Sequence, residues 1–191
     1  MKVDHARAFL LDLRAVKIEA DSVLPFSRPV VYAAYRDELT KFVSYLPNVR
    51  SIEVKSSSTE GPITKLFNVW HGGGDIPAAL RSVVGDKVLA WDDYATWNAD
   101  DWSCNWDIKT HAFTEAVTCR GKNTFVELPG DRTRLEIHGD ITIDVKKISG
   151  VPSFLAGSIG KSVESFLVKQ ITANLSSVSE GRSRYLADRK S

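Results

Sequence analysis

The sequence predicts an α+β protein in which a curved antiparallel sheet of about seven strands surrounds a long C-terminal helix. Three observations support this fold class. Two short helical segments follow one alternating segment, several alternating segments then succeed one another without a helical interruption, and the C-terminal part changes to a helical period. Strands that follow one another directly are joined by hairpins, so we expect an antiparallel sheet.

The composition indicates a single folded domain. A chain of 191 residues, 43 % hydrophobic and 26 % charged, lies near the averages of folded globular proteins and can bury a sizeable core. We assign residues 15–191 to one domain and residues 1–14 to an N-terminal extension. The 25 basic and 24 acidic residues leave a net charge of +1, which creates no general field for nucleic acid, so we expect no nucleic-acid partner.

The N-terminal residues and the cysteines predict a cytoplasmic protein. The apolar stretch before Arg14 is short and contains Asp12, unlike a secretory signal peptide. No segment reaches the roughly 18–20 apolar residues that a membrane span needs. We expect Cys104 and Cys119 to be buried thiols, and a disulfide in an oxidising compartment is the alternative.

The first strand and the helices after it have marked boundaries. Residues 15–24 alternate between apolar and polar side chains, as in a half-buried strand. Ser27 can cap a following helix, whose first turn tolerates Pro29. The helical spacing predicts a bend near Asp37, and Pro47 ends the helical pair.

The remaining strands are expected to form hairpins. Turn-forming residues separate them at 56–61, 98–101 and 129–131. The expected strands are 49–56, 63–71, 87–98, 101–110, 113–128 and 133–148, with a loop at 72–75 and a short helix or edge strand at 76–81. In the last strand apolar residues from Leu135 to Val145 alternate with polar ones such as His138, so we expect one face of it to be buried and the other exposed.

The C-terminal part predicts one long amphipathic helix from Ser153 to about Asp188, because apolar residues recur there at helical spacing and charged residues lie off that stripe. At about 1.5 Å per residue, some 30 residues span roughly 45 Å, enough to cross a whole sheet. We expect Gly157 and Gly160 to permit close approach to a strand. The alternative is that they leave space for a ligand or let the helix bend as a lid.

This order of elements resembles the helix-grip fold of the START-like superfamily, also called SRPBCC. The resemblance rests on the strand-then-proline opening at 20–29, the exit from the helical pair at 46–49, the end of the last long strand at 139–143, and the segment 149–152 before the long helix. The chain is similar in particular to bacterial START-like proteins of unassigned function. The resemblance implies an apolar cavity between the sheet and the C-terminal helix, and hydrophobic ligands such as lipids, sterols or polyketides.

Four of the five tryptophans fall in one short stretch, at positions 91, 97, 102 and 106. Trp91 and Trp97 share one strand parity, and Trp102 and Trp106 share another, so a tight turn between them would align the rings on one face of a hairpin. Such rings can form the aromatic wall of a ligand cavity. Core packing against the C-terminal helix and a membrane-interface anchor are the alternatives.

Few polar side chains are candidates for the interior. Asp93 shares a parity with Trp91, and His71 shares one with Phe67 and Val69, so both could orient a polar group of a ligand if those faces are internal. Asp93 at a bulge and a solvent-facing His71 are the alternatives. The sequence shows no metal-ligand spacing, no phosphate-binding loop and no nucleophile elbow.

We therefore predict a protein that binds, and can transfer, a hydrophobic small molecule or lipid without a cofactor, with transient membrane contact as an additional expectation. Two alternatives remain: an aromatase/cyclase-like or hydrolytic enzyme that uses Asp93 or a histidine as general base, and an interaction module with a filled core. No catalytic residue and no metal ligand is assigned. The predicted ligand-binding residues are Phe67, Val69, Leu89, Trp91, Asp93, Trp97, Trp102, Trp106, Leu135, Ile137, Ile141, Ile159, Val163 and Phe166.

Overall fold

The computed structural model describes residues 13–73, 89–144, 147, 165, 168–169, 177–178 and 180–188. Its elements follow one another as predicted, with one strand, two short helices and then six strands. They are β1 (Leu13–Leu24), α1 (Arg28–Asp37), η2 (Leu39–Tyr45), β2 (Val49–Glu60), β3 (Ile63–Gly72), β4 (Ala90–Asn98), β5 (Ser103–Thr110), β6 (Val117–Leu128) and β7 (Arg132–Asp144).

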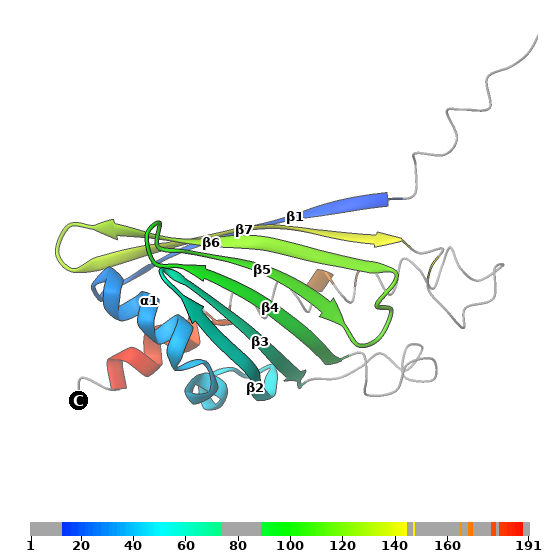
Figure 1. Ribbon diagram of the computed structural model, residues 1–191, viewed down its shortest axis with the longest axis horizontal. Helices are drawn as coiled ribbons and strands as arrows, with labels where there is room; N and C mark the ends of the chain where they lie inside the picture. Colours follow the sequence, from blue (N-terminus) through cyan, green and yellow to red (C-terminus); the bar gives the residue numbers. More distant parts are fainter. Residues whose placement is uncertain are drawn as a thin grey trace, which may run out of the picture.

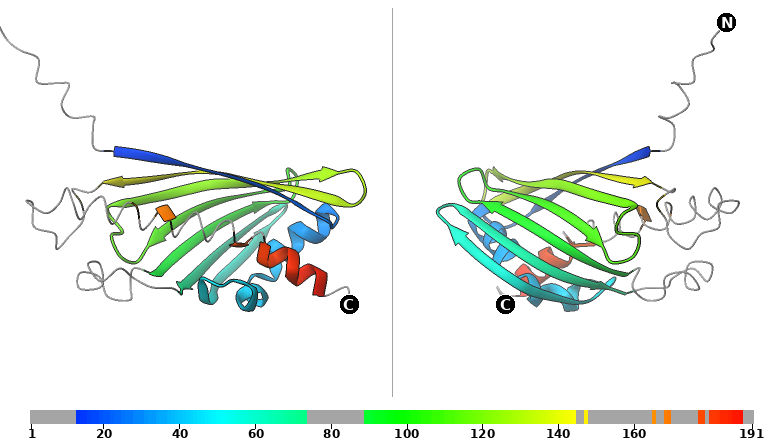
Figure 2. Two further views of the ribbon diagram at one scale, coloured as in Figure 1. Left: turned by 180° about the vertical axis from the view of Figure 1, so that it is seen from behind. Right: turned by 45° about the vertical axis from the view of Figure 1, so that its right-hand side comes forward.

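The seven strands form one antiparallel sheet in the order β1-β7-β6-β5-β4-β3-β2. Every connection between sequential neighbours from β2 to β7 joins adjacent strands, and β1 closes the other edge by pairing with β7. The sheet is curved, and α1, η2 and the C-terminal helical residues 180–188 lie on its concave side (Figures 1 and 2). This arrangement confirms the α+β fold class and the antiparallel sheet.

The two helices after β1 differ in type. Ser27 occupies the N-cap of α1, but its side chain makes no capping bond, and the first helical bond runs from the Val31 amide to the Ser27 carbonyl at 3.0 Å. The predicted bend lies at Glu38, where φ is −117°. The second segment, η2, is a 3-10 helix of seven residues, which is long for this tighter form.

The first hairpin is longer than predicted. The serine-rich stretch that we expected to form a turn at 56–61 belongs to β2, and the chain reverses only at Gly61 and Pro62. Gly61 has a φ of +55°, a conformation that glycine adopts without strain. Hydroxyl side chains pair across this hairpin, with 3.1 Å between Thr59 Oγ1 and Thr64 Oγ1, so the polar stretch forms a strand without an apolar core beneath it.

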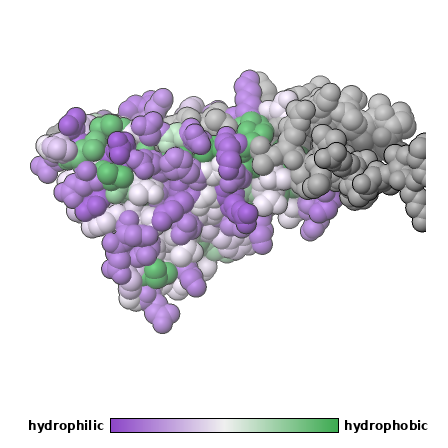
Figure 3. Space-filling view, turned by 90° about the horizontal axis from the view of Figure 1, so that it is seen from above, coloured by the Kyte–Doolittle hydropathy of each residue, from purple (hydrophilic) through white to green (hydrophobic). Residues whose placement is uncertain are grey.

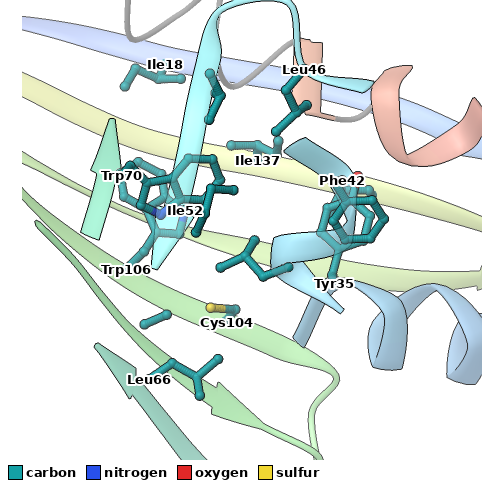
Figure 4. Packing of buried hydrophobic residues seen from close by; sticks show 14 of the residues in the cluster. Ile18, Tyr35, Phe42, Leu46, Ile52, Leu66, Trp70, Cys104, Trp106 and Ile137 are labelled. Atoms are coloured by element: carbon teal, nitrogen blue, oxygen red, sulfur yellow. The ribbon is translucent and has the colours of Figure 1, made fainter. Parts of the chain in front are cut away.

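The core fills the concave side of the sheet (Figure 4). Side chains of β3 to β7 meet those of α1 and η2 there, and Phe42, Phe125 and Leu135 are fully buried. The face seen from above in Figure 3 is covered mainly by hydrophilic side chains. The alternation predicted for β7 is confirmed, because Leu135, Ile137, Ile141 and Ile143 are buried, whereas His138 is exposed.

Helical residues 180–188 pack on the two short helices. Tyr185 stacks edge-on against Phe42 at 4.7 Å between ring centroids, and its hydroxyl donates to Glu38 Oε2 at 2.6 Å. A Cβ atom at Gly181 would lie 2.7 Å from the Tyr45 carbonyl oxygen, so glycine permits this close approach. The helix predicted from Ser153 to about Asp188 is seen at residues 165, 168–169, 177–178 and 180–188, and its remainder lies outside the described residues.

Candidate ligand-binding site

Strand register decides which predicted site residues share the inner, concave face. In β3 and β4, Trp70 pairs with Trp91, Asn68 with Asp93, and Leu66 with Ala95. Because Trp97 of β4 packs against Tyr32 of α1, the odd-numbered side chains of β4 face inward. Trp91, Asp93 and Trp97 therefore lie on the inner face. Trp106 of β5 lies there too, because it pairs with Ala95 of β4.

Phe67 and Val69 lie on the opposite, outer face, and this corrects their predicted place in the cavity wall. They pair with Tyr94 and Asp92, whose side chains point away from the helices. Phe67 stacks on Tyr94 with an interplanar angle of 3° and 4.8 Å between centroids. The parity within β3 could be recognised from the sequence, but only the pairing with β4 shows that its even-numbered residues face inward.

Trp102 also departs from the prediction. It lies in the β4–β5 turn with a φ of 52°, before β5 begins, so the alternation that directs the side chains of Cys104 and Trp106 does not extend to it. The ring contacts Tyr32 edge-on at 5.2 Å, and the Arg28 guanidinium lies 4.5 Å from its centroid. Trp102 thus covers the end of the sheet next to α1.

Part of the inner face is filled by protein side chains. Trp97 meets Tyr32 edge-on at 5.2 Å and lies 5.9 Å from Phe125, and Tyr35 contacts the same phenylalanine at 5.4 Å. For Trp97, core packing is therefore the observed role. Other predicted wall residues are equally deep in the core: Leu89, Leu135, Ile137 and Ile141.

The other part of the inner face, which we call the Trp91 half, consists of Trp70, Trp91, Asp93, Trp106 and Ile108. Trp70 and Trp91 stack at 5.7 Å with an interplanar angle of 17°. Although they point to the concave side, Trp91, Asp93 and Ile108 each keep accessible surface. This half of the face combines large apolar rings with surface that a small molecule can contact.

Three hydrogen-bonded side chains, Asn68, Trp70 and Asp93, together with Arg182, whose charge acts on Asp93, form what we call the buried polar cluster. Its members are buried except Asp93, which keeps part of its surface accessible. Asn68 Nδ2 and Trp70 Nε1 both donate to Asp93 Oδ2, at 3.1 and 3.3 Å. Burial raises the pKa of Asp93 above its ordinary value, and these two hydrogen bonds and the charge of Arg182 oppose that shift.

Arg182 extends from the C-terminal helical residues into the same region. Its guanidinium lies 3.4 Å from the ring centroid of Tyr35 and 4.5 Å from that of Phe42, and the residue is 3 % exposed. Burial lowers the pKa of Arg182 to about 10, so it remains charged at neutral pH. A cation on two aromatic faces is held by the ring quadrupoles in addition to the field of Asp93.

The sequence alone did not identify three members of this cluster. Asn68 and Trp70 could have been found by parity, since they lie on the same face of a strand as the apolar residue Leu66. Arg182 carried no such signal, because it belongs to a polar C-terminal stretch. The remaining predicted residues Ile159, Val163 and Phe166 are outside the part of the chain whose side chains the structure describes.

The described part of the chain also bears on the sequence-based expectations for metal ligands, membrane spans and free thiols. No group of three or more His, Cys, Asp or Glu side chains there could hold a metal ion. Within the same residues, no helix is long and apolar enough to span a membrane. Cys104 and Cys119 are buried free thiols, as expected, and His71 is partly exposed beside Glu53.

A separate groove lies at the β2 edge of the sheet. It has a volume of about 370 Å³ and lies between the end of α1, η2 and the β2–β3 hairpin. None of the predicted ligand-binding residues lines it. Its lining residues are Arg36, Asp37, Leu39, Thr40, Val54, Ser57, Thr59, Thr64 and Leu66.

Solved structures share this architecture at low sequence identity. TTHA0849 from Thermus thermophilus superposes with a TM-score of 0.64 at 19% identity, over 92% of this chain and 100% of that chain. The Zhui aromatase/cyclase from a Streptomyces species gives 0.60 at 13% identity, over 90% of this chain and 96% of its own. Norcoclaurine synthase from Thalictrum flavum, in complex with dopamine and hydroxybenzaldehyde, gives 0.60 at 13% identity, over 94% of this chain and 91% of its own.

No protein-family model matches the sequence, and no curated protein matches it either. At these identities the structural likeness establishes the fold. The seven-stranded curved sheet, the two helices after β1 and the C-terminal helical residues on the concave side agree with the solved structures over nearly the whole chain. The chain therefore has the helix-grip α+β fold that these solved structures share.

Proposed function

We propose that this protein binds a hydrophobic small molecule or lipid on the concave side of the sheet, against the Trp91 half of the inner face. The observation that carries the proposal is the combination of the stacked Trp70–Trp91 pair with partly accessible Trp91, Asp93 and Ile108 side chains. An inward-facing wall of rigid rings gives a ligand a large apolar contact at low entropic cost.

The fold and the solved structures that share it support this proposal. One solved structure with this architecture, norcoclaurine synthase, holds dopamine and hydroxybenzaldehyde, and another is an aromatase/cyclase. The two molecules bound to norcoclaurine synthase are small and contain an aromatic ring. The other half of the inner face, around Trp97 and Phe125, is packed with protein side chains, so it provides a rigid boundary for a site in the Trp91 half.

The proposal is tested first by native mass spectrometry of the freshly purified full chain, followed by organic extraction. A stoichiometric apolar molecule would support it and reveal its chemical class. The neutral dye Nile red is then titrated into wild type, Trp91→Ala and Tyr94→Ala. These two substitutions remove aromatic rings from opposite faces of the same strand, β4.

We expect Trp91→Ala to weaken Nile red binding by about tenfold, equivalent to about 1.4 kcal/mol. Tyr94→Ala should leave it unchanged, because Tyr94 stacks on Phe67 on the outer face. Circular dichroism checks that both variants fold. An empty mass together with no binding of Nile red would contradict the proposal and favour an interaction module.

A further inference from the structure

The buried polar cluster contains hydrogen-bonding atoms of both kinds that the fold leaves without partners. Asn68 is 1 % exposed, and its Oδ1 atom accepts no hydrogen bond among the described residues. The Nε and Nη1 atoms of Arg182 are buried as well and donate no hydrogen bond among the described residues. A buried polar atom of this kind destabilises the structure while it stays unsatisfied, so a ligand group that supplies the missing hydrogen bond is favoured.

The orientation of the Asn68 amide follows from its neighbour. Its Nδ2 donates to Asp93 Oδ2 at 3.1 Å, and this leaves Oδ1 directed elsewhere as an acceptor. Asp93 Oδ2 already accepts from both Asn68 and Trp70, so the other carboxylate oxygen, Oδ1, is the one that remains for a further donor. This side of the cluster therefore requires a donor.

The opposite side requires an acceptor. Arg182 is held by the rings of Tyr35 and Phe42, which satisfy its charge but not its N–H groups. The charges of Arg182 and Asp93 act on each other, yet the two side chains form no ion pair in the described structure. The two charged side chains are therefore not paired directly with each other, and each keeps hydrogen-bonding capacity for a ligand.

We infer that the cluster recognises the polar end of the ligand, and that this end is an uncharged group that both donates and accepts, such as an alcohol or a primary amide. Its donor meets Asp93 or Asn68 Oδ1, or both where the group is an amide with two N–H hydrogens, and its acceptor meets Arg182. A carboxylate would satisfy Arg182 but would lie beside Asp93, and an ammonium group would have the reverse conflict. The inference rests on the proposed function and specifies which hydrophobic molecules the site takes.

The experiment compares three probes that share a ten-carbon chain and differ only in the head group: 1-decanol, decanoate and decylammonium. Their dissociation constants are measured by displacement of Nile red at pH 7.5, below micellar concentrations. For the wild-type chain we expect 1-decanol to bind at least tenfold more tightly than either ion.

Two variants assign this preference to the cluster. Asp93→Asn replaces the carboxylate by an amide that can donate, so decanoate should gain about tenfold relative to 1-decanol. Asp107→Asn makes the same chemical change at an exposed position of β5, on the outer face, and should leave all three constants unchanged. Arg182→Met provides a second variant if its fold is intact, and it should weaken 1-decanol and decanoate while sparing decylammonium.

The outcomes separate the inference from the proposed function. Binding of 1-decanol with the expected shift in Asp93→Asn supports both. Equal affinity for all three probes, tighter binding of an ion, or an unchanged preference in Asp93→Asn overturns the inference and leaves hydrophobic binding intact. Failure of every probe, Nile red included, overturns the proposed function itself.

Discussion

Trp106 lies over Gly121, and its indole occupies the space in which a side chain at position 121 would lie. A Cβ atom there would be 2.3 Å from Trp106 Cζ2 and equally close to the His138 carbonyl oxygen. Gly139, which pairs with Gly121 across β6 and β7, has the same relation to the ring, with Trp106 Cη2 at 2.6 Å. The indole is anchored by its Nε1 atom, which donates to Asn123 Oδ1 at 2.9 Å.

This contact predicts a large cost for Gly121→Ala. The substitution should lower the free energy of unfolding by about 3 kcal/mol, because the methyl group meets both a rigid ring and a backbone carbonyl of the next strand. Urea denaturation measures the effect. Trp106→Leu combined with Gly121→Ala should recover only part of the loss, since the clash with the His138 carbonyl remains.

Gly130→Ala is the matched control for this prediction. Gly130 has a φ of 76° in the β6–β7 turn, and a Cβ atom there meets nothing within 4 Å. Its cost should be about 1 kcal/mol, from backbone strain alone. Equal losses for the two variants would mean that Trp106 does not pack on Gly121.

Two tryptophans of β4 should differ in their contribution to stability. Trp97 is 5 % exposed and lies against Tyr32 and Phe125, so Trp97→Ala should cost about 3–5 kcal/mol. Trp91 is only half-buried and loses mainly its stacking with Trp70, so Trp91→Ala should cost about 1–2 kcal/mol. Urea denaturation of both variants checks this, and a larger loss for Trp91→Ala would place Trp91 in the core.

The two thiols should be unreactive in the folded protein. Burial raises the pKa of Cys119 to about 12 and that of Cys104 well above its ordinary value, so neither forms the nucleophilic thiolate at pH 8. Ellman's reagent should label neither cysteine in the native state and both in urea. The single variants Cys104→Ala and Cys119→Ala assign any signal, and rapid labelling of native protein would show that one thiol is accessible.

The stability of the protein should depend on the protonation of Asp93. Its pKa in the folded state is raised above the ordinary value of 3.8, mainly by burial, so between these two pKa values the native state holds a proton that the unfolded state has lost. Stability contributed by this group is therefore greatest at low pH and falls as the pH rises from 3.8 through the folded-state pKa. Arg182, Cys104 and Cys119 are the other titratable groups whose charges interact with it, and all three keep their protons throughout that range.

Asp93→Asn removes this dependence. The unfolding free energy of the variant relative to wild type should increase with pH across the same window, as followed by urea denaturation at several pH values. Asp107→Asn, on the exposed outer side of β5, should show no such trend. A constant difference between Asp93→Asn and wild type would mean that Asp93 ionises normally in the folded protein.

The predicted strands and the predicted face of β7 were confirmed, because both depend on short-range alternation. Leu135, Ile137 and Ile141 are buried at successive inward positions, as the pattern requires when one face of a sheet is covered. The Pro129–Asp131 turn was confirmed too, since Gly130 and Asp131 have the positive φ values that such a turn needs. The serine-rich end of β2 was predicted wrongly, because it is stabilised by pairing with β3 and not by any property of its own residues.

The amino-acid sequence determined the order of elements, the antiparallel sheet and the richness of one hairpin in tryptophan, because propensity and periodicity act over a few residues. The three-dimensional fold determined which tryptophans support the core and which face the candidate site. It also placed Asn68 beside Asp93 and brought Arg182 onto the rings of Tyr35 and Phe42, where its charge acts on Asp93. Those relations depend on strand register and on the docking of the C-terminal helical residues, and each joins side chains that are far apart in the sequence.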